Sequence, residues 1–179
     1  MVVMVALLRG VNVGGSGALR MADLRAIATG VGFEQVRSYI QSGNLVFSTP
    51  RGSTKQVAAR LRKAIADAGE VDPEVIVRSR AELAQLVADN PFLARGEHPA
   101  KLHVLFLEGP AAATIDGLDA ARRLPEEVIA VGRELHLLLP GGVGRSKLAT
   151  DVARHLGATG TMRGWRTVLK LQEVADDLA

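Results

Sequence analysis

The sequence predicts a mixed α+β protein built from two tandem repeats of the order β-α-β-β-α-β-α. Short apolar runs of strand length alternate with longer segments of helical periodicity, and the order of these segments in residues 1–92 returns in residues 101–179. Each repeat has two adjoining strand segments in its middle, as a hairpin requires. A β-α-β-β-α-β unit usually folds as a ferredoxin-like, four-stranded antiparallel sheet, so we expect two such sheets, each with an extra terminal helix.

The first repeat begins with an apolar strand and alternates as the repeat order requires. Its expected elements, in chain order, cover residues 2–8, 21–30, 35–41, 44–48, 53–68, 74–78 and 80–88. Ser53 with Gln56, and Ser79 with Glu82, have the spacing of capping boxes, in which two side chains satisfy free amides at the beginning of a helix. Both pairs support the helices that follow them.

The second repeat has the same order of elements. They are expected at residues 102–107, 113–122, 127–132, 134–139, 147–156, 159–163 and 165–178. Between the repeats lies the polar segment LARGEHPA, which is broken by Gly96 and Pro99 and follows Pro91, a residue that disfavours helical geometry at Asn90. We therefore place the first repeat at 1–92, a linker at 93–100 and the second repeat at 101–179.

Composition narrows the classes of function. The chain has 179 residues, of which 47% are hydrophobic, and it has no cysteine, which excludes disulfides, thiolate catalysis and zinc fingers. The first apolar stretch, residues 1–8, is too short to span a bilayer and lacks a basic leader and a cleavage motif. We therefore expect a cytoplasmic protein without a membrane partner. The net charge of +3 permits an anionic partner without requiring one.

A glycine-rich loop, RGVNVGGSG, follows the first strand at residues 9–17. Its glycine spacing approaches that of a Walker A loop, but Ser16 stands where the lysine should be, and Arg20 stands where a dinucleotide fingerprint needs its third glycine. Both motifs are therefore excluded. Gly14 and Gly15 still allow backbone amides to turn toward an anion. The alternative interpretation is a crossover whose glycines adopt positive φ.

The predicted topology brings a second polar segment, the turn QSGN, to the same end of the first sheet. Strands 1 and 2 of a ferredoxin-like unit run in the same direction, so the loop after strand 1 meets the turn after strand 2. A tight turn explains Gly43 and Asn44, which tolerate positive φ, but not Gln41. The residues expected to gather at this end are Arg9, Asn12, Gln41, Ser42 and Asn44.

Basic residues of the second repeat lie in two further loops. In GGVGRSK, the residues Arg145, Ser146 and Lys147 lead into a helix and suit a phosphate or nucleic-acid contact; the alternative is a solvated loop with Ser146 as the helix cap. In MRGWR, Arg163 precedes the only tryptophan, Trp165, which suits stacking on a base. The alternative for Trp165 is an anchor in the core.

The segments LLRGVNVGG, LRAIATGVGFEQVRSYIQSGNLVF, NPF, GVGRSKL and TMRGWRTVLKL together resemble the bacterial domain-of-unknown-function 1697 family and span nearly the whole chain. The resemblance implies a duplicated α+β fold and supplies no activity, substrate or cofactor. One departure is visible, because the family usually has Arg-Asn-Trp-Asn-Thr near its end, where this chain has Arg-Gly-Trp-Arg-Thr at 163–167. A ligand contact made by either asparagine in relatives would be missing here.

Enzyme signatures are sparse. Ser42 lacks the Gly-x-Ser-x-Gly elbow, the four histidines have no spacing typical of zinc ligands, and the carboxylates form no pair suited to acid–base catalysis. We therefore expect no metal and no cofactor. The sequence leaves open whether the protein is an enzyme.

Three functions fit these observations. The favoured one is non-catalytic binding of an anionic ligand through these Gly/Arg loops. The ligand would be a phosphate-bearing small molecule or a nucleic acid. Aromatic residues make up only 3% of the chain, so a nucleic acid would be held by its phosphates rather than by stacked bases. The alternatives are a small-molecule enzyme with a polar site at the end of the first sheet, and a structural or interaction scaffold. The oligomeric state has no signal in the sequence.

Overall fold

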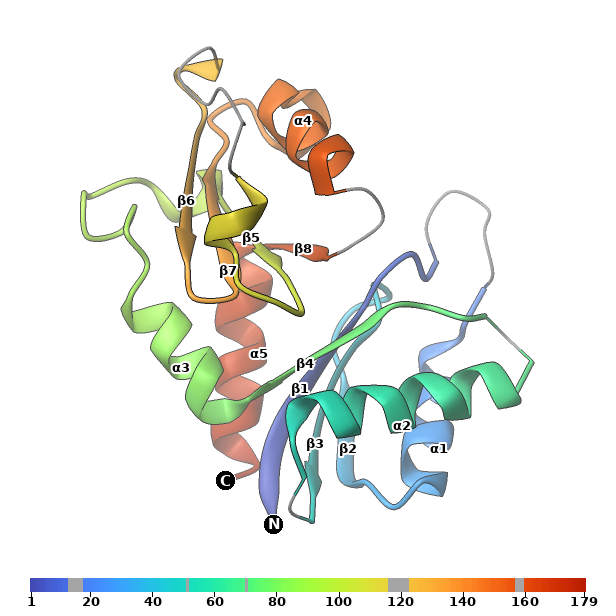
Figure 1. Cartoon of the computed structure of the whole chain (residues 1–179). Helices are drawn as coiled ribbons and strands as arrows, with labels where there is room; N and C mark the ends of the chain where they lie inside the picture. The colour runs from blue at the N-terminus through green and yellow to red at the C-terminus, as the bar shows by residue number, and fades with distance from the viewer. Residues whose placement is uncertain (13–17, 51, 70, 116–122, 157–159) are drawn as a thin grey trace. The chain divides into compact units, whose positions relative to one another are not determined.

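The protein is described by a computed structural model that covers residues 1–12, 18–50, 52–69, 71–115, 123–156 and 160–179 (Figure 1). These residues form two four-stranded antiparallel sheets and five α-helices, which confirms the predicted mixed α+β class. The chain divides into two compact units. Unit 1 comprises Met1–Ala84 and Lys170–Ala179, and unit 2 comprises Gln85–Leu169. Among the described residues, no helix is both long and apolar enough to cross a membrane.

Unit 1 holds the first sheet, whose strands lie in the order β2-β3-β1-β4. All three strand pairs are antiparallel. The elements follow the expected ranges closely: β1 (Val2–Leu8), α1 (Met21–Gly30), β2 (Glu34–Ser38), β3 (Asn44–Thr49), α2 (Thr54–Asp67), β4 (Val75–Ser79) and α3 (Arg80–Ala88). Helix α3 begins in unit 1 and ends in unit 2.

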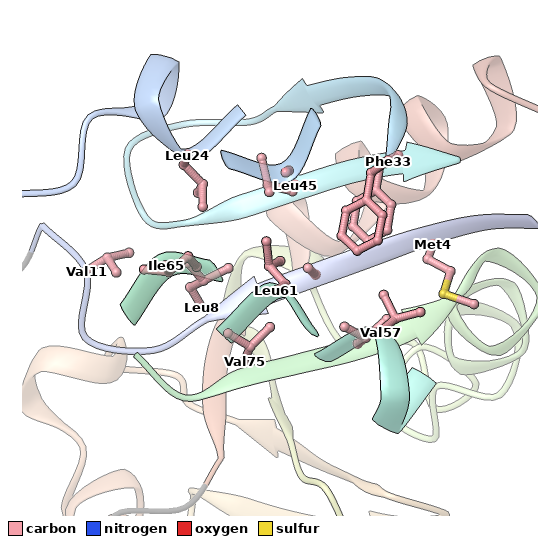
Figure 2. Packing of buried hydrophobic residues seen from close by; sticks show 14 of the residues in the cluster. Met4, Leu8, Val11, Leu24, Phe33, Leu45, Val57, Leu61, Ile65 and Val75 are labelled. Atoms are coloured by element: carbon pink, nitrogen blue, oxygen red, sulfur yellow. The ribbon is translucent and has the colours of Figure 1, made fainter. Parts of the chain in front are cut away.

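The core of unit 1 lies between the sheet and the helices α1 and α2. Successive strand residues point to opposite faces, so Met4, Ala6 and Leu8 of β1 share the core face. The buried residues of α2 recur every four positions, at Val57, Leu61 and Ile65, and form one apolar stripe along the helix. Figure 2 shows these helix side chains pointing toward those of the sheet.

Both predicted capping boxes are confirmed. The Gln56 amide donates to Ser53 Oγ at 3.2 Å, and the Ser53 amide donates to Gln56 Oε1 at 3.0 Å. At the beginning of α3, the Glu82 amide donates to Ser79 Oγ at 3.2 Å and the Ser79 amide donates to Glu82 Oε2 at 2.7 Å. Each pair satisfies two amides that have no partner inside their helix.

Unit 2 holds the second sheet, whose strands lie in the order β6-β7-β5-β8, again antiparallel throughout. Its elements are β5 (Leu102–Phe106), β6 (Glu127–Val131), β7 (Glu134–Leu138), α4 (Lys147–Leu156), β8 (Thr161–Gly164) and α5 (Trp165–Asp177), whose last part belongs to unit 1. The helix expected at 113–122 appears only as a short 3-10 helix, Ala112–Thr114, because residues 116–122 lie outside the described ranges.

A tight turn after α3 leads into the segment expected to be a linker, residues 93–100. Asn90 is buried, and its Oδ1 accepts hydrogen bonds from the amides of Phe92, at 3.0 Å, and Leu93, at 3.1 Å. A short 3-10 helix, Pro99–Lys101, leads from this segment into β5. A repeat boundary within residues 93–100 stays a prediction.

The two faces of the second sheet differ in chemistry. One face carries leucines of β5 and β7, such as Leu105 and Leu137, which pack with α4. On the other face Val104 lies opposite His136 of β7 and opposite Arg163 of β8. All three residues of this row are buried. Arg163 therefore lies on the face of the sheet that α4 does not cover.

Candidate functional site

The loop after β1 contacts the turn before β3 at one end of unit 1, as the topology predicts. Asn12 makes this contact: its Nδ2 donates to the carbonyls of Leu19 and Gln41, both at 2.8 Å. Its Oδ1 accepts from the Leu19 amide at 2.9 Å. Asn12 has a φ of 57°, in the left-handed region that asparagine tolerates. Both amide hydrogens of Asn12 are therefore used to hold the two loops together.

Gly43 makes the close approach of the two segments possible. Its φ is +73°, and a Cβ at this position would lie 2.4 Å from Val11 Cγ2 and 2.8 Å from Leu8 Cβ. The carbonyl of Gly43 also accepts from the Leu8 amide at 2.8 Å. A side chain at position 43 would collide with the end of β1.

Asn44 does not have the positive φ expected of it, because it is the first residue of β3. It is buried, and its Nδ2 donates to the Tyr39 carbonyl at 3.0 Å and to Ser42 Oγ at 2.9 Å. The positive φ in this turn falls at Ile40 and Gly43. The polar side chains of Ser42 and Asn44 thus contribute to the folding of the turn itself.

Arg9 pairs with a carboxylate that the sequence did not point to. Its Nη1 lies 3.7 Å from Glu74 Oε2, and its amide donates to the Glu74 carbonyl at 2.9 Å. These contacts join the end of β1 to the residue before β4. Gly14 and Gly15, the other candidates in this loop, lie outside the described residues.

A polar pocket of about 310 Å³ lies in unit 2 beside the first turns of α4. It contains the predicted residues Arg145, Ser146 and Lys147. Its lining consists of Arg123, Gly144, Arg145, Ser146, Lys147, Thr150, Asp151 and Arg154. Four of these side chains are cationic and one is a carboxylate, so the pocket favours an anion.

The local sequence determines the backbone conformation of the loop that leads into α4. Gly142 has a φ of 80°, which turns the chain after β7 into a 3-10 turn, Val143–Arg145. Ser146 Oγ then accepts from the Ala149 amide at 2.8 Å, which confirms its interpretation as the cap of α4. The Thr150 hydroxyl donates to the Ser146 carbonyl at 2.9 Å.

The first amides of α4 are already hydrogen-bonded within the protein. The Leu148 amide donates to Glu126 Oε2 at 3.0 Å, and the Ala149 amide donates to Ser146. The partial positive charge at the beginning of the helix therefore faces protein oxygens. A ligand in the pocket would be held by side chains rather than by these two amides.

The four cations of the pocket fall into two groups. Arg123 Nε donates to Asp151 Oδ2 at 2.6 Å, and Arg154 Nη1 lies 3.4 Å from Asp151 Oδ1, so one carboxylate serves both arginines. Arg145 and Lys147 are exposed, and their side chains have no hydrogen bond or ion pair with any residue in the described ranges. These two cations keep their charge available for a ligand.

Arg163 and Trp165 are not part of this pocket. Arg163 is 8% exposed, its Nη1 donates to Thr161 Oγ1 at 2.7 Å and to the Met162 carbonyl at 2.8 Å, and burial lowers its pKa to about 10. Trp165 is 1% exposed, so it has no free ring face for a base and is an anchor in the core.

Sequence reasoning missed Arg123, Asp151 and Arg154. Asp151 and Arg154 follow Lys147 by four and seven positions, which places them on one face of α4, but this spacing is also that of an ordinary solvated helix face. Arg123 comes from a distant segment, and no local pattern connects it with Asp151. Among the described residues, no three side chains are grouped as metal ligands would be.

Nearly the whole chain is similar to the solved structure of a conserved bacterial protein, SP0830 from Streptococcus pneumoniae. The two share 24% of their residues, the similarity covers 97% of this chain and 98% of that one, and the TM-score is 0.75. No curated protein is significantly similar to the chain. The profile of a family described as "Protein of unknown function (DUF1697)" matches residues 1–136, which end before the departure at 163–167. Because this match covers more than half of the sequence, the chain belongs to the DUF1697 family, as the resemblance of its motifs predicted.

Proposed function

We propose that this is a cytoplasmic, non-catalytic protein that binds an anionic ligand, a phosphate-bearing small molecule or the phosphates of a nucleic acid, in the pocket of unit 2. The observation that carries the proposal is the pair Arg145 and Lys147, two exposed cations without a partner in the described ranges. They stand beside Asp151, which holds two further arginines in place. Cations prearranged in a concave site bind phosphate oxygens by charge-assisted hydrogen bonds.

Two other cations of the described surface, Arg62 and Arg95, differ from this pair because each already contacts a carboxylate. Arg62 donates to Asp72 through two nitrogens, at 2.7 and 2.9 Å. Arg95 makes the same kind of contact with Glu127, and this hydrogen bond raises the pKa of Arg95. A cation that already has a carboxylate gains little from an external anion. The pair in the pocket has no such competitor among the described residues.

The end of unit 1 is better explained as part of the scaffold. Asn12 and Asn44 use their side-chain donors within the fold, and Arg9 lies beside Glu74. An enzyme that orients a substrate there would need such groups to be available. This observation favours the pocket of unit 2 over the alternative of a polar enzyme site at the end of the first sheet.

We also propose that residues 1–92 and 101–179 are repeats of one ferredoxin-like unit, joined by a linker at residues 93–100. The two sheets share one strand order, which supports a common origin. Arg78 of β4 and Arg163 of β8 lie opposite the equivalent central-strand residues Val5 and Val104. Both arginines are buried, and each donates Nη1 to the carbonyl of the residue before it, at 3.1 and 2.8 Å.

Titration calorimetry with inorganic pyrophosphate tests the binding function. The double variant R145A/K147A is compared with K55A/R166A, which removes the same charge from two exposed positions on α2 and α5. We expect the pocket variant to bind at least about tenfold more weakly, because hydrogen bonds to charged groups are lost. The control variant keeps wild-type affinity, and added salt weakens the wild-type binding.

Two results would refute the proposal. The first is the absence of binding by the wild-type protein to both pyrophosphate and a short DNA duplex. The second is an equal loss in the two variants, which would mean that net charge, rather than the pocket, attracts the anion.

A further inference from the structure

We infer that the ligand of this pocket is a small phosphorylated polyol, of the sugar-phosphate class, that carries no aromatic base. The inference rests on the proposed function, because it names the ligand class for the same pocket. It depends on the size of the pocket, on the absence of any aromatic or large apolar side chain from its lining, and on the position of one carboxylate among the cations.

The pocket suits a compact ligand. Its volume of about 310 Å³ lies at the lower end of the range of roughly 300–1,000 Å³ that is usual for small-molecule sites. Single-stranded nucleic acid instead requires an extended basic groove, in which a site takes about four nucleotides or more. The pocket has room for one phosphate group and a short attached chain or ring.

Its lining offers no aromatic ring on which a nucleobase would stack. The chain has six aromatic residues, and five of them are no more than 1% exposed: Phe33, Phe47, Phe92, Phe106 and Trp165. The sixth, Tyr39, belongs to unit 1. The segments 116–122 and 157–159, outside the described ranges, contain no aromatic residue either. A base in this pocket would have only arginine planes and polar groups to contact, and the arginines are the groups that a phosphate also needs.

One side of the pocket suits hydroxyl groups. The Asp151 carboxylate, held by Arg123 and Arg154, accepts hydrogen bonds but repels a second phosphate. The Thr150 hydroxyl uses its hydrogen on the Ser146 carbonyl, so its lone pairs are left to accept from a ligand. These acceptors match the O–H donors of a polyol.

The cations that would hold the phosphate and the acceptors that would hold the hydroxyl groups have the separation that such a ligand needs. Lys147 and Asp151 are four residues apart on α4, which places them about 6 Å apart along the helix axis. They make no ion pair with each other in the described structure. A ligand can therefore place its phosphate at Arg145 and Lys147 and its hydroxyl groups at Asp151 and Thr150.

Calorimetry on the full chain with five probes tests this ligand class: ribose 5-phosphate, inorganic phosphate, ribose, adenosine 5′-monophosphate and a short single-stranded oligonucleotide. We expect ribose 5-phosphate to bind at least tenfold more tightly than inorganic phosphate or ribose. Adenosine 5′-monophosphate should bind no more tightly than ribose 5-phosphate, because the base finds no aromatic ring in the pocket.

The variant D151N gives a sharper readout. It removes the charge that repels anions and weakens the acceptor for hydroxyl groups, so it should tighten binding of inorganic phosphate and weaken binding of ribose 5-phosphate. A purely structural role of Asp151 would change both affinities in the same direction. The matched control is D67N, at an exposed aspartate of α2 that pairs with Lys63 at 2.5 Å. T150V supplies a second measurement that leaves the Asp151 pairs intact, and it should weaken ribose 5-phosphate alone.

The outcomes separate this inference from the proposed function. Binding of inorganic phosphate that R145A/K147A abolishes, with no gain from the ribose, would overturn the ligand class and leave anion binding standing. Tenfold tighter binding of adenosine 5′-monophosphate or of the oligonucleotide than of ribose 5-phosphate would also overturn it. A protein that binds none of the phosphate probes refutes both.

Discussion

Gly43 shows how a single residue determines the geometry at the end of the first sheet. The space that its missing side chain leaves is occupied by Val11 and Leu8, and its backbone has a positive φ. Two independent constraints therefore act on this one position, one steric and one conformational. Asn12 completes the contact with its three hydrogen bonds.

Gly43→Ala should destabilise the protein by about 2–4 kcal/mol, because a methyl group is forced against β1 and an L-residue is forced into the left-handed region. Gly32→Ala is the control, since Gly32 also has a positive φ, of +84°, but nothing lies within 4 Å of its Cβ position. It should lose only about 1 kcal/mol. Urea unfolding measures both values, and equal losses would contradict the steric argument.

His136 makes stability depend on pH. It is 1% exposed, and burial lowers its pKa to about 4, although the charge of Asp89 acts in the opposite direction. In the unfolded chain, His136 takes up a proton near the ordinary histidine pKa of 6.5, whereas in the folded protein it stays neutral at that pH. The contribution of neutral His136 to the free energy of unfolding is therefore complete above about pH 6.5. It is lost as the pH falls toward 4, by about 3 kcal/mol in total.

His136→Leu should flatten this part of the pH dependence. The measurement is the free energy of unfolding in urea at several pH values between 7.5 and 4.5, for the variant and the wild type. His155→Leu removes an exposed histidine of α4 and should leave the slope unchanged. If the slope persists in His136→Leu, other groups cause the pH dependence.

At the scale of the element, α4 combines three roles on its surface. Leu148 and Val152 pack against the sheet, Ser146 and Glu126 satisfy its first amides, and its remaining face lines the pocket with Lys147 and its neighbours. The apolar face holds the helix in place, so the charged face is presented from a rigid support. The loop before α4 and the helix itself thus supply the lining of the pocket apart from Arg123.

Ser146→Ala should lower stability by about 1 kcal/mol, because the Ala149 amide loses its acceptor. Ser146→Thr keeps the hydroxyl and should restore most of this loss. Since the two amides at the beginning of α4 are not assigned to the ligand, Ser146→Ala should keep its affinity for pyrophosphate. Thermal unfolding and calorimetry measure the two effects, and a binding loss without a stability loss would assign the Ser146 hydroxyl to the ligand.

At the scale of the whole molecule, the chain crosses between its two units twice, once in α3 and once in α5. The last ten residues return to unit 1, where Arg80 pairs with Asp176 at 2.9 Å and Arg37 with Asp177 at 3.9 Å. Leu171, Ala175 and Leu178 of this segment are buried. The segment is therefore part of the folded core rather than a tail.

Deletion of residues 170–179 should cost at least about 3 kcal/mol, because more than one buried apolar side chain is removed together with the ion pairs. Deletion of the exposed Ala179 alone should have no measurable effect. Circular dichroism and the fluorescence of Trp165 during urea unfolding report on the two deletions. An unchanged unfolding midpoint in the longer deletion would contradict a core role.

Much of the architecture could be predicted because its signals are local. Short apolar runs identified β1 and β3, and hydroxyl–carboxamide or hydroxyl–carboxylate spacing located the beginnings of α2 and α3. The candidate site was predicted only in part. Arg145 and Lys147 stand out beside their glycines, whereas Arg123 and Asp151 lie 28 positions apart and become partners only when the chain folds.

Local sequence also fails to distinguish the two Gly/Arg loops of the second repeat. In sequence, GRSK and RGW look alike, with an arginine next to a glycine at the boundary of a helix. In the fold, Arg145 is exposed beside α4, whereas Arg163 is buried on the face of the sheet that α4 does not cover, and Trp165 is buried too. Local patterns were enough for the elements, since periodicity and capping act over a few residues. Which arginine meets solvent depends on which sheet face is covered, and only the packing of distant elements decides that.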